Sequence, residues 1–144
     1  MYIITKHDGL PIKQLLQYPI PKIVHFSVTG LGNSKYEPGV MKYSDMLDRI
    51  EGLIQQGLDP QMCTMRIDPI IPGVTPINVV EDIIKRSSQM GITKIRCSVL
   101  DKYSTTKKYM EALGYNYTEH GYSANDSDRH ASPEVVNRIV AAVK

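Results

Sequence analysis

The chain of 144 residues is long enough to bury a core as one domain, and 42% hydrophobic with 22% charged residues is ordinary for a globular protein. A formal net charge of +2, with the basic residues scattered along the sequence, does not indicate nucleic-acid binding. The sequence shows no signal peptide and no long apolar segment, so we expect a cytoplasmic location and no membrane partner.

Short apolar and β-branched segments predict four strands, and each is followed by a segment with helical periodicity. The predicted strands are residues 2–5, 23–28, 62–68 and 94–100. The predicted helices are residues 10–18, a helix with Ser44 as N-cap that ends at Gly57, a helix that Thr75 caps with its hydroxyl, with Pro76 at its first position, and that ends at Gly91, residues 104–113, and a C-terminal helix at about 133–143. The polar, tyrosine-rich segment 115–129 is expected to be a loop, with a possible short strand at 115–118.

Strands that alternate regularly with helices imply right-handed βαβ units and a parallel sheet. The expected fold class is therefore α/β, with residues 1–144 in a single domain. The alternation itself fits either a doubly wound sheet or a segment of a (β/α) barrel.

The third predicted strand carries the strongest local signal. Residues alternate between an apolar side with Cys63, Met65 and Ile67 and a polar side that includes Arg66 and Asp68. Pro69 and Pro72 remove backbone donors, so the strand is expected to stop at this point. A charged pair at the carboxyl end of a parallel strand is either part of a ligand site or a structural ion pair.

Polar residues also follow the other predicted strands. The first strand ends in Thr5-Lys6-His7-Asp8, and the carboxyl ends of parallel strands meet at one edge of the sheet. Polar side chains there can simply be solvated, but all four strands end in this way, which favours a ligand site. Cations would bind a carboxylate or phosphate, and hydroxyl and carboxylate groups would bind amine or ribose groups. The candidate binding residues are Lys6, Ser27, Thr29, Arg66, Asp68 and Ser98.

Other chemical motifs are weak. Gly30-Leu31-Gly32 resembles the start of a nucleotide-binding loop but lacks the third glycine and a prompt helix. His25 is expected to be a packing residue. His120 and His130 are expected to be solvated, although either could close over a ligand. Cys63 and Cys97 are expected to be buried, reduced thiols, and the histidines and cysteines show no metal-ligand spacing. No residue is assigned a catalytic role.

Five segments together resemble radical S-adenosylmethionine enzymes, in particular the spore photoproduct lyase-like branch. The likeness covers roughly residues 2–113, and its most specific part is the arginine-aspartate-proline segment. The matching segments are Thr5-Lys6, Phe26-Ser27-Val28-Thr29-Gly30, Glu37-Pro38-Gly39, Arg66-Ile67-Asp68-Pro69-Ile70-Ile71-Pro72-Gly73 and Ser98-Val99-Leu100-Asp101-Lys102-Tyr103.

The resemblance implies a partial (β/α) barrel whose strand ends bind S-adenosylmethionine. It implies that Lys6 contacts the methionyl carboxylate, that Ser27 also contacts the cofactor, and that Arg66 and Asp68 face the cleft. The chain departs from the family because it lacks the three closely spaced cysteines that hold a [4Fe–4S] cluster. Alone, it is therefore not expected to perform radical chemistry.

The missing cysteines leave three interpretations. The chain is the cofactor-binding part of a split enzyme whose partner chain carries the cluster, a clusterless domain that binds a ligand or a protein, or a fragment of a longer product. The chain also begins at the family's second strand, so residues 2–5 are expected to leave a sheet edge that can pair with another chain. We therefore expect a cluster-bearing partner or a homo-oligomer formed through this edge.

Overall fold

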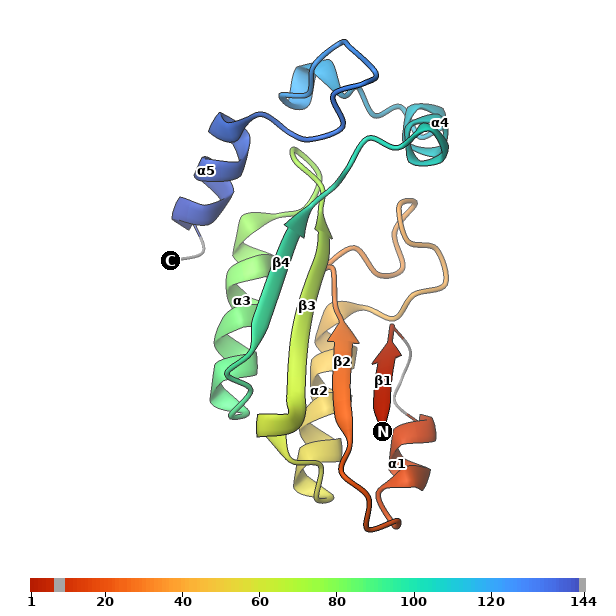
Figure 1. Ribbon diagram of the computed structural model, residues 1–144, viewed down its shortest axis with the longest axis vertical. Coiled ribbons are helices and arrows are strands. Elements are labelled where there is room, and N and C mark those ends of the chain that lie inside the picture. Colours follow the sequence, from red (N-terminus) through yellow and green to blue (C-terminus); the bar gives the residue numbers. More distant parts are fainter. Residues whose placement is uncertain (7–9, 143–144) are drawn as a thin grey trace.

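The computed structural model describes residues 1–6 and 10–142 and contains an all-parallel, four-stranded sheet in the order β1-β2-β3-β4 (Figure 1). The strands are β1 Tyr2–Thr5, β2 Ile23–Ser27, β3 Cys63–Ile70 and β4 Ile95–Val99. The helices are α1 Leu10–Leu15, α2 Tyr43–Gln55, α3 Ile77–Gln89, α4 Ser104–Ala112 and α5 Pro133–Ala142, with short 3-10 helices η1 Pro60–Met62 and η2 Thr118–His120. The predicted α/β class, a partial (β/α) barrel with a parallel sheet and flanking helices, is confirmed.

Helices α2 and α3 lie behind the sheet in Figure 1 and bury one of its faces. The apolar side predicted for the third strand is confirmed, since Cys63, Met65 and Ile67 are fully buried. The helices contribute their apolar stripes to the same core, including Ile50 of α2 and Ile83 of α3, both 0% exposed. The buried residues of the strand alternate along the chain, and those of the helices recur about every 3.6 residues. Both sets therefore pack together in one interface between the sheet and the helices.

The opposite face of the sheet, which we call the open face, has no helix over it in the described part of the chain (Figure 1). Tyr2, Ile4 and Ile23 on this face are 60%, 56% and 43% exposed. Parallel sheets are usually covered on both faces, so a parallel sheet with exposed apolar side chains on one face is unusual. The open face is therefore the natural surface on which to look for binding.

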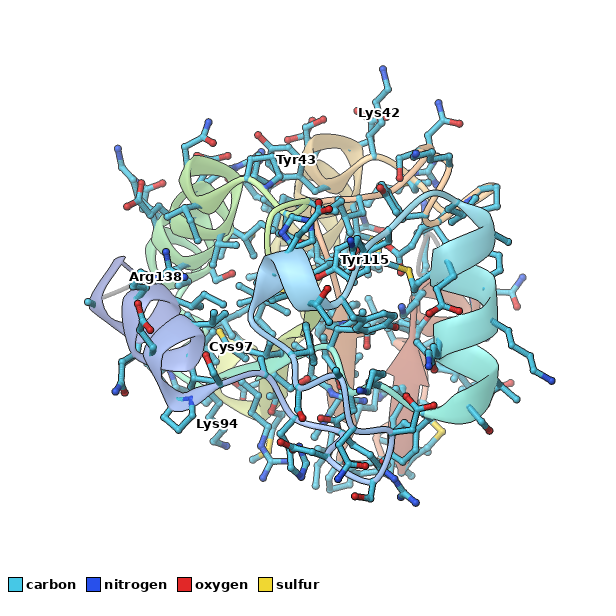
Figure 2. The ribbon with its side chains drawn as sticks, turned by 90° about the horizontal axis from the view of Figure 1, so that it is seen from above. Lys42, Tyr43, Lys94, Cys97, Tyr115 and Arg138 are labelled. Carbon is cyan, nitrogen blue, oxygen red and sulfur yellow. The ribbon has the colours of Figure 1, made fainter. Side chains whose placement is uncertain are left out.

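The last part of the chain lies beyond the carboxyl ends of the strands, and Figure 2 looks down on it from above. The segment predicted as a polar loop instead contains a small aromatic core, in which Tyr115, Tyr117 and Tyr122 are each 4% exposed. Their rings pack edge to face with centroids 4.9 Å apart. Tyr115 and Tyr122 donate hydrogen bonds to the carbonyls of Pro72 (2.9 Å) and Leu100 (2.5 Å). These bonds fasten the C-terminal segment to the ends of β3 and β4.

Several predicted boundaries were wrong. Strand β3 does not stop before Pro69 but continues to Ile70, with a register shift against β4 between Ile67 and Ile70 that accommodates the missing donor. Helix α1 ends at Leu15 rather than Tyr18. The segment 115–118 is not a strand, since it leads into the 3-10 helix η2.

Two predicted helix caps were also wrong. Ser44 lies inside α2, and its hydroxyl contacts the Asp45 carboxylate at 3.2 Å. The Thr75 hydroxyl accepts a hydrogen bond from the backbone N–H of Ile71 (2.9 Å) and so closes the loop after β3 instead of capping α3. In both cases a neighbouring polar group competes for the hydroxyl that the sequence pattern assigned to a cap.

The two cysteines differ, and only one agrees with the sequence-based expectation. Cys63 is buried, whereas Cys97 is exposed because β4 is an edge strand. Burial, with a smaller contribution from the Asp59 carboxylate, raises the pKa of Cys63 to about 11, so little thiolate forms near neutral pH.

We expect one thiol per chain to react rapidly with Ellman's reagent at pH 8, and a second only after denaturation. Cys97→Ser should abolish the rapid reaction, while Cys63→Ala should leave it intact. Two thiols that react equally fast in the native protein would contradict the burial of Cys63.

Candidate functional site

Three of the predicted site residues form one hydrogen-bonded network on the open face. Arg66 forms an ion pair with Asp68, and Ser98 donates a hydrogen bond of 2.5 Å to the other carboxylate oxygen of Asp68. The side chains of Arg66 and Asp68 are 28% and 34% exposed, so the pair is partly shielded but reachable from solvent. The arginine and aspartate are therefore a structural ion pair and, at the same time, a polar group at the carboxyl end of the sheet.

Positive charge surrounds this network. In the strand register, Arg66 lies beside Ser27 of β2 on one side and Arg96 of β4 on the other. His25, two residues before Ser27, packs against Tyr2 with the two rings tilted by 51°, and it shares a hydrogen bond of 3.3 Å with the Tyr2 hydroxyl. Burial is the largest cause that lowers the pKa of His25, followed by the positive charges of Arg66, Arg96 and Lys94. The open face is thus an electropositive surface that suits an anionic group.

Lys6 and Thr29 belong to a second group, built around a residue that the sequence analysis did not assign to the site. Glu37 accepts a hydrogen bond from Lys6 at 2.7 Å through one carboxylate oxygen and a bond from the Thr29 hydroxyl through the other. The Glu37 side chain is only 13% exposed. Lys6 therefore already has a carboxylate partner within the chain. His7 and Asp8, which follow it in the predicted rim, lie outside the described residues.

The loop between β2 and α2 places Glu37. The backbone of Gly32 approaches the Met41 carbonyl so closely that an added Cβ would be 1.8 Å from that oxygen. Gly32 also forms an isolated parallel bridge with Glu37, and Asn33 donates a backbone hydrogen bond of 3.2 Å to the Glu37 carbonyl. A Cβ added at Gly30 would be 2.6 Å from the side chain of Val79 in α3. Packing within the loop and against α3 therefore explains both glycines without a bound phosphate.

The space near Lys6 is small. A crevice lined by Lys6, Ser27, Thr29 and neighbouring residues has a volume of about 10 Å³, which is the room that one water molecule needs. A ligand of nucleoside size does not fit there as the loop stands. The structure thus divides the six candidate residues into two groups, of which Arg66, Asp68 and Ser98 lie outside this crevice.

The residues that the structure describes do not fit an iron–sulfur cluster. Within residues 1–6 and 10–142, no group of three histidine, cysteine or carboxylate side chains could hold a metal ion. Cys63 is buried, and its thiol approaches the Asp59 carbonyl at 3.4 Å, while Cys97 lies on the edge strand. A cluster would have to be held by another chain or by residues beyond those described.

No protein-family model, curated protein or solved structure matches this chain. No helix in the described ranges is both long and apolar enough to cross a membrane. Any function must therefore be argued from the geometry of the open face and the carboxyl end of the sheet.

Proposed function

We propose that the chain is the S-adenosylmethionine-binding portion of a radical-SAM-like enzyme, with the ligand on the open face across Arg66, Asp68 and Ser98. The network of these three side chains at the carboxyl end of β3 and β4 is the observation that carries the proposal. Ligands of parallel α/β sheets bind at this end of the strands, where loops and side chains from neighbouring strands converge.

The chemistry of the network suits the methionyl and adenosyl groups. An arginine has five N–H donors, so Arg66 can bind a ligand carboxylate while it keeps its bond to Asp68. The Asp68 carboxylate retains free acceptor positions for an ammonium or hydroxyl group. The Ser27 hydroxyl lies beside Arg66 in the strand register and could extend the site toward β2. Lys6 could bind the ligand only by exchanging Glu37 for the ligand's carboxylate.

We assign enzymatic activity only to an assembly with a partner chain that supplies the [4Fe–4S] cluster. The absence of a cluster-forming set among the described residues supports this division of roles. A neighbouring gene that encodes three clustered cysteines would be consistent with it. Because both cysteines are free, we also propose a reducing, cytoplasmic location.

We expect calorimetric titration with S-adenosylmethionine to detect binding and Arg66→Ala to weaken it about thirtyfold, or about 2 kcal/mol, because a charged partner of the ligand carboxylate is lost. Lys6→Ala should have a smaller effect, since Lys6 is already paired with Glu37. Arg86→Ala is the matched control, because Arg86 pairs with Asp48 between the helices on the covered side of the sheet. Equal affinities of Arg66→Ala and the native chain would contradict the proposed site.

The pKa of His25 offers a second readout of the same event. The charge of Arg66 helps to lower this pKa, so an anionic group bound at Arg66 should raise it toward its ordinary value. The C–H resonances of His25 can be followed by NMR over a pH series, with and without the ligand. Absence of both binding heat and a His25 shift would leave the alternative function below.

The exposed apolar side chains favour one alternative, a clusterless, non-catalytic domain that binds another protein. Strand β1 is an edge of the sheet among the described residues, and it presents Tyr2 and Ile4 beside Ile23 of β2. An edge strand with exposed apolar residues can add a strand from a second chain. We expect light scattering to show a homo-oligomer at micromolar concentration, and Ile4→Lys to dissociate it. A stable monomer would count against pairing through this edge.

A further inference from the structure

A second hollow lies at the carboxyl end of the sheet and contains none of the six candidate residues. It has a volume of about 610 Å³ and is formed by the loop after β3, by η2 and by α5. Cavities of this size bind small organic molecules. Figure 2 shows Arg138, a lining residue that belongs to α5, on the left. Ligand binding in this hollow is therefore independent of the function proposed above.

The interior wall of this cavity is apolar and rigid. Ile70 at the end of β3 and Ile71 are 1% and 4% exposed overall, and Val135 and Ile139 of α5 are 7% and 8% exposed. These residues also belong to the main hydrophobic core, so the wall cannot collapse inward without disturbing the packing of the sheet. The cavity therefore offers a preformed surface for a hydrocarbon or aromatic group.

His120 provides a polar group held in a fixed position. Its ring stacks on Tyr115, with centroids 4.7 Å apart and planes 20° apart, so the sequence-based expectation of a merely solvated side chain was wrong. The backbone of Gly73 also lies close to the ring, since an added Cβ there would be 2.2 Å from it. Within the described residues, neither ring nitrogen has a hydrogen-bond partner. A ring held by Tyr115 and close to the backbone of Gly73, with its nitrogens unused, can bind a ligand at little cost in side-chain entropy.

Arg138 provides a cation at the same cavity. It is exposed and forms no ion pair with the described part of the chain. Glu119 also lines the cavity, and its carboxylate accepts a hydrogen bond of 2.7 Å from the Asn116 amide. Glu119 offsets part of the positive charge of Arg138, and most of the remaining lining is apolar, so the cavity suits a ligand with one charged group and an apolar body better than a fully hydrated phosphate.

We propose that this cavity binds a small organic carboxylate with an apolar body. The carboxylate lies against Arg138 and the nitrogens of His120, and the apolar body lies on Ile70, Ile71 and Ile139. This is a second binding site that goes beyond the proposed S-adenosylmethionine site and does not depend on it, because the two share no candidate residue.

Octanoate is a suitable probe, and methyl-selective NMR of the isoleucines gives a site-specific readout. Octanoate should shift the methyl resonances of Ile70, Ile71 and Ile139 and leave those of Ile50, a buried residue of α2, unchanged. Arg138→Gln should weaken octanoate binding at least tenfold. His120→Phe, which preserves the stacking on Tyr115, should weaken it by a smaller factor. Arg129→Gln should leave the affinity within twofold, since Arg129 stacks on Tyr103 and does not line this cavity.

Two further ligands test the chemical class. The uncharged 1-octanol and inorganic phosphate should each bind at least tenfold more weakly than octanoate. Equal affinity for octanol would overturn the role of Arg138, and tighter binding of phosphate would overturn the assignment to a carboxylate. Unchanged methyl resonances with octanoate, or equal affinities of the native chain and Arg138→Gln, would overturn the site itself. None of these outcomes bears on Arg66, so failure here is distinct from failure of the proposed function.

Discussion

Replacement of Phe26 by alanine is expected to lower the free energy of unfolding by about 3–5 kcal/mol, the usual cost of removing a buried aromatic ring. Phe26 is the single phenylalanine of the chain, is 0% exposed and is one of the largest fully buried side chains. It lies in β2 beside Met65 of β3, which is also fully buried, so the cavity left by the ring cannot be filled from solvent. The loss combines lost burial of apolar surface with the cost of an empty space.

Urea denaturation followed by circular dichroism measures this loss, with the slope of the transition checked for change. Ile4→Ala is the control, because Ile4 lies on the open face of the neighbouring strand and is 56% exposed. Its cost should stay below about 1 kcal/mol. A Phe26→Ala protein as stable as Ile4→Ala would show that the covered face of the sheet is not the main core.

Replacement of Lys102 by methionine is expected to lower the free energy of unfolding by about 2–4 kcal/mol, since it removes charged hydrogen bonds from a buried position. The Lys102 side chain is only 2% exposed. Its ammonium donates hydrogen bonds to the carbonyls of Ser123 (2.7 Å) and Asn125 (3.0 Å), and the Asp126 carboxylate lies 3.6 Å away. Methionine has a similar length and no donor, so these carbonyls would lose their partner.

The loss of stability in Lys102→Met should be largest in the segment around Ser123 and Asn125, whose carbonyls Lys102 binds. Hydrogen exchange should accelerate most in residues 121–131, in addition to the global loss of stability. Lys107→Met is the matched control, because Lys107 pairs with the same Asp126 at 2.7 Å from a partly exposed position on α4, and its replacement should change stability little. Equal effects of the two variants would show that burial of the ammonium is not what makes Lys102 important.

The parts of the fold that periodicity encodes could be predicted from the sequence. Cys63, Met65 and Ile67 alternate with polar residues, and Val80 and Ile83 recur at helical spacing, so both elements and their buried sides followed from local patterns. The proximity of Arg66, Asp68 and Ser98 followed in turn from the parallel order of the strands. These features need no knowledge of distant contacts.

The features that were missed depend on contacts between distant residues. Lys6 and Glu37 are 31 positions apart, and only the folded loop shows that the lysine is already paired. Tyr115 and Tyr122 have no regular spacing, and their hydroxyls make the segment look polar in sequence. Each hydroxyl in fact donates to a backbone carbonyl at a strand end, which allows the ring to be buried. A cluster of tyrosines in a supposed loop is the signal that could have indicated a small core.

The two edges of the sheet restrict how copies of this chain can assemble. Because all strands are parallel and the edges are β1 and β4, a twofold axis that joins β1 to β1 would create an antiparallel junction. Joining β1 of one copy to β4 of the next would keep every strand parallel. A closed ring of two such copies would contain about eight strands, the number in a complete (β/α) barrel. The symmetry of any oligomer would therefore reveal whether the open face becomes the inside of a barrel.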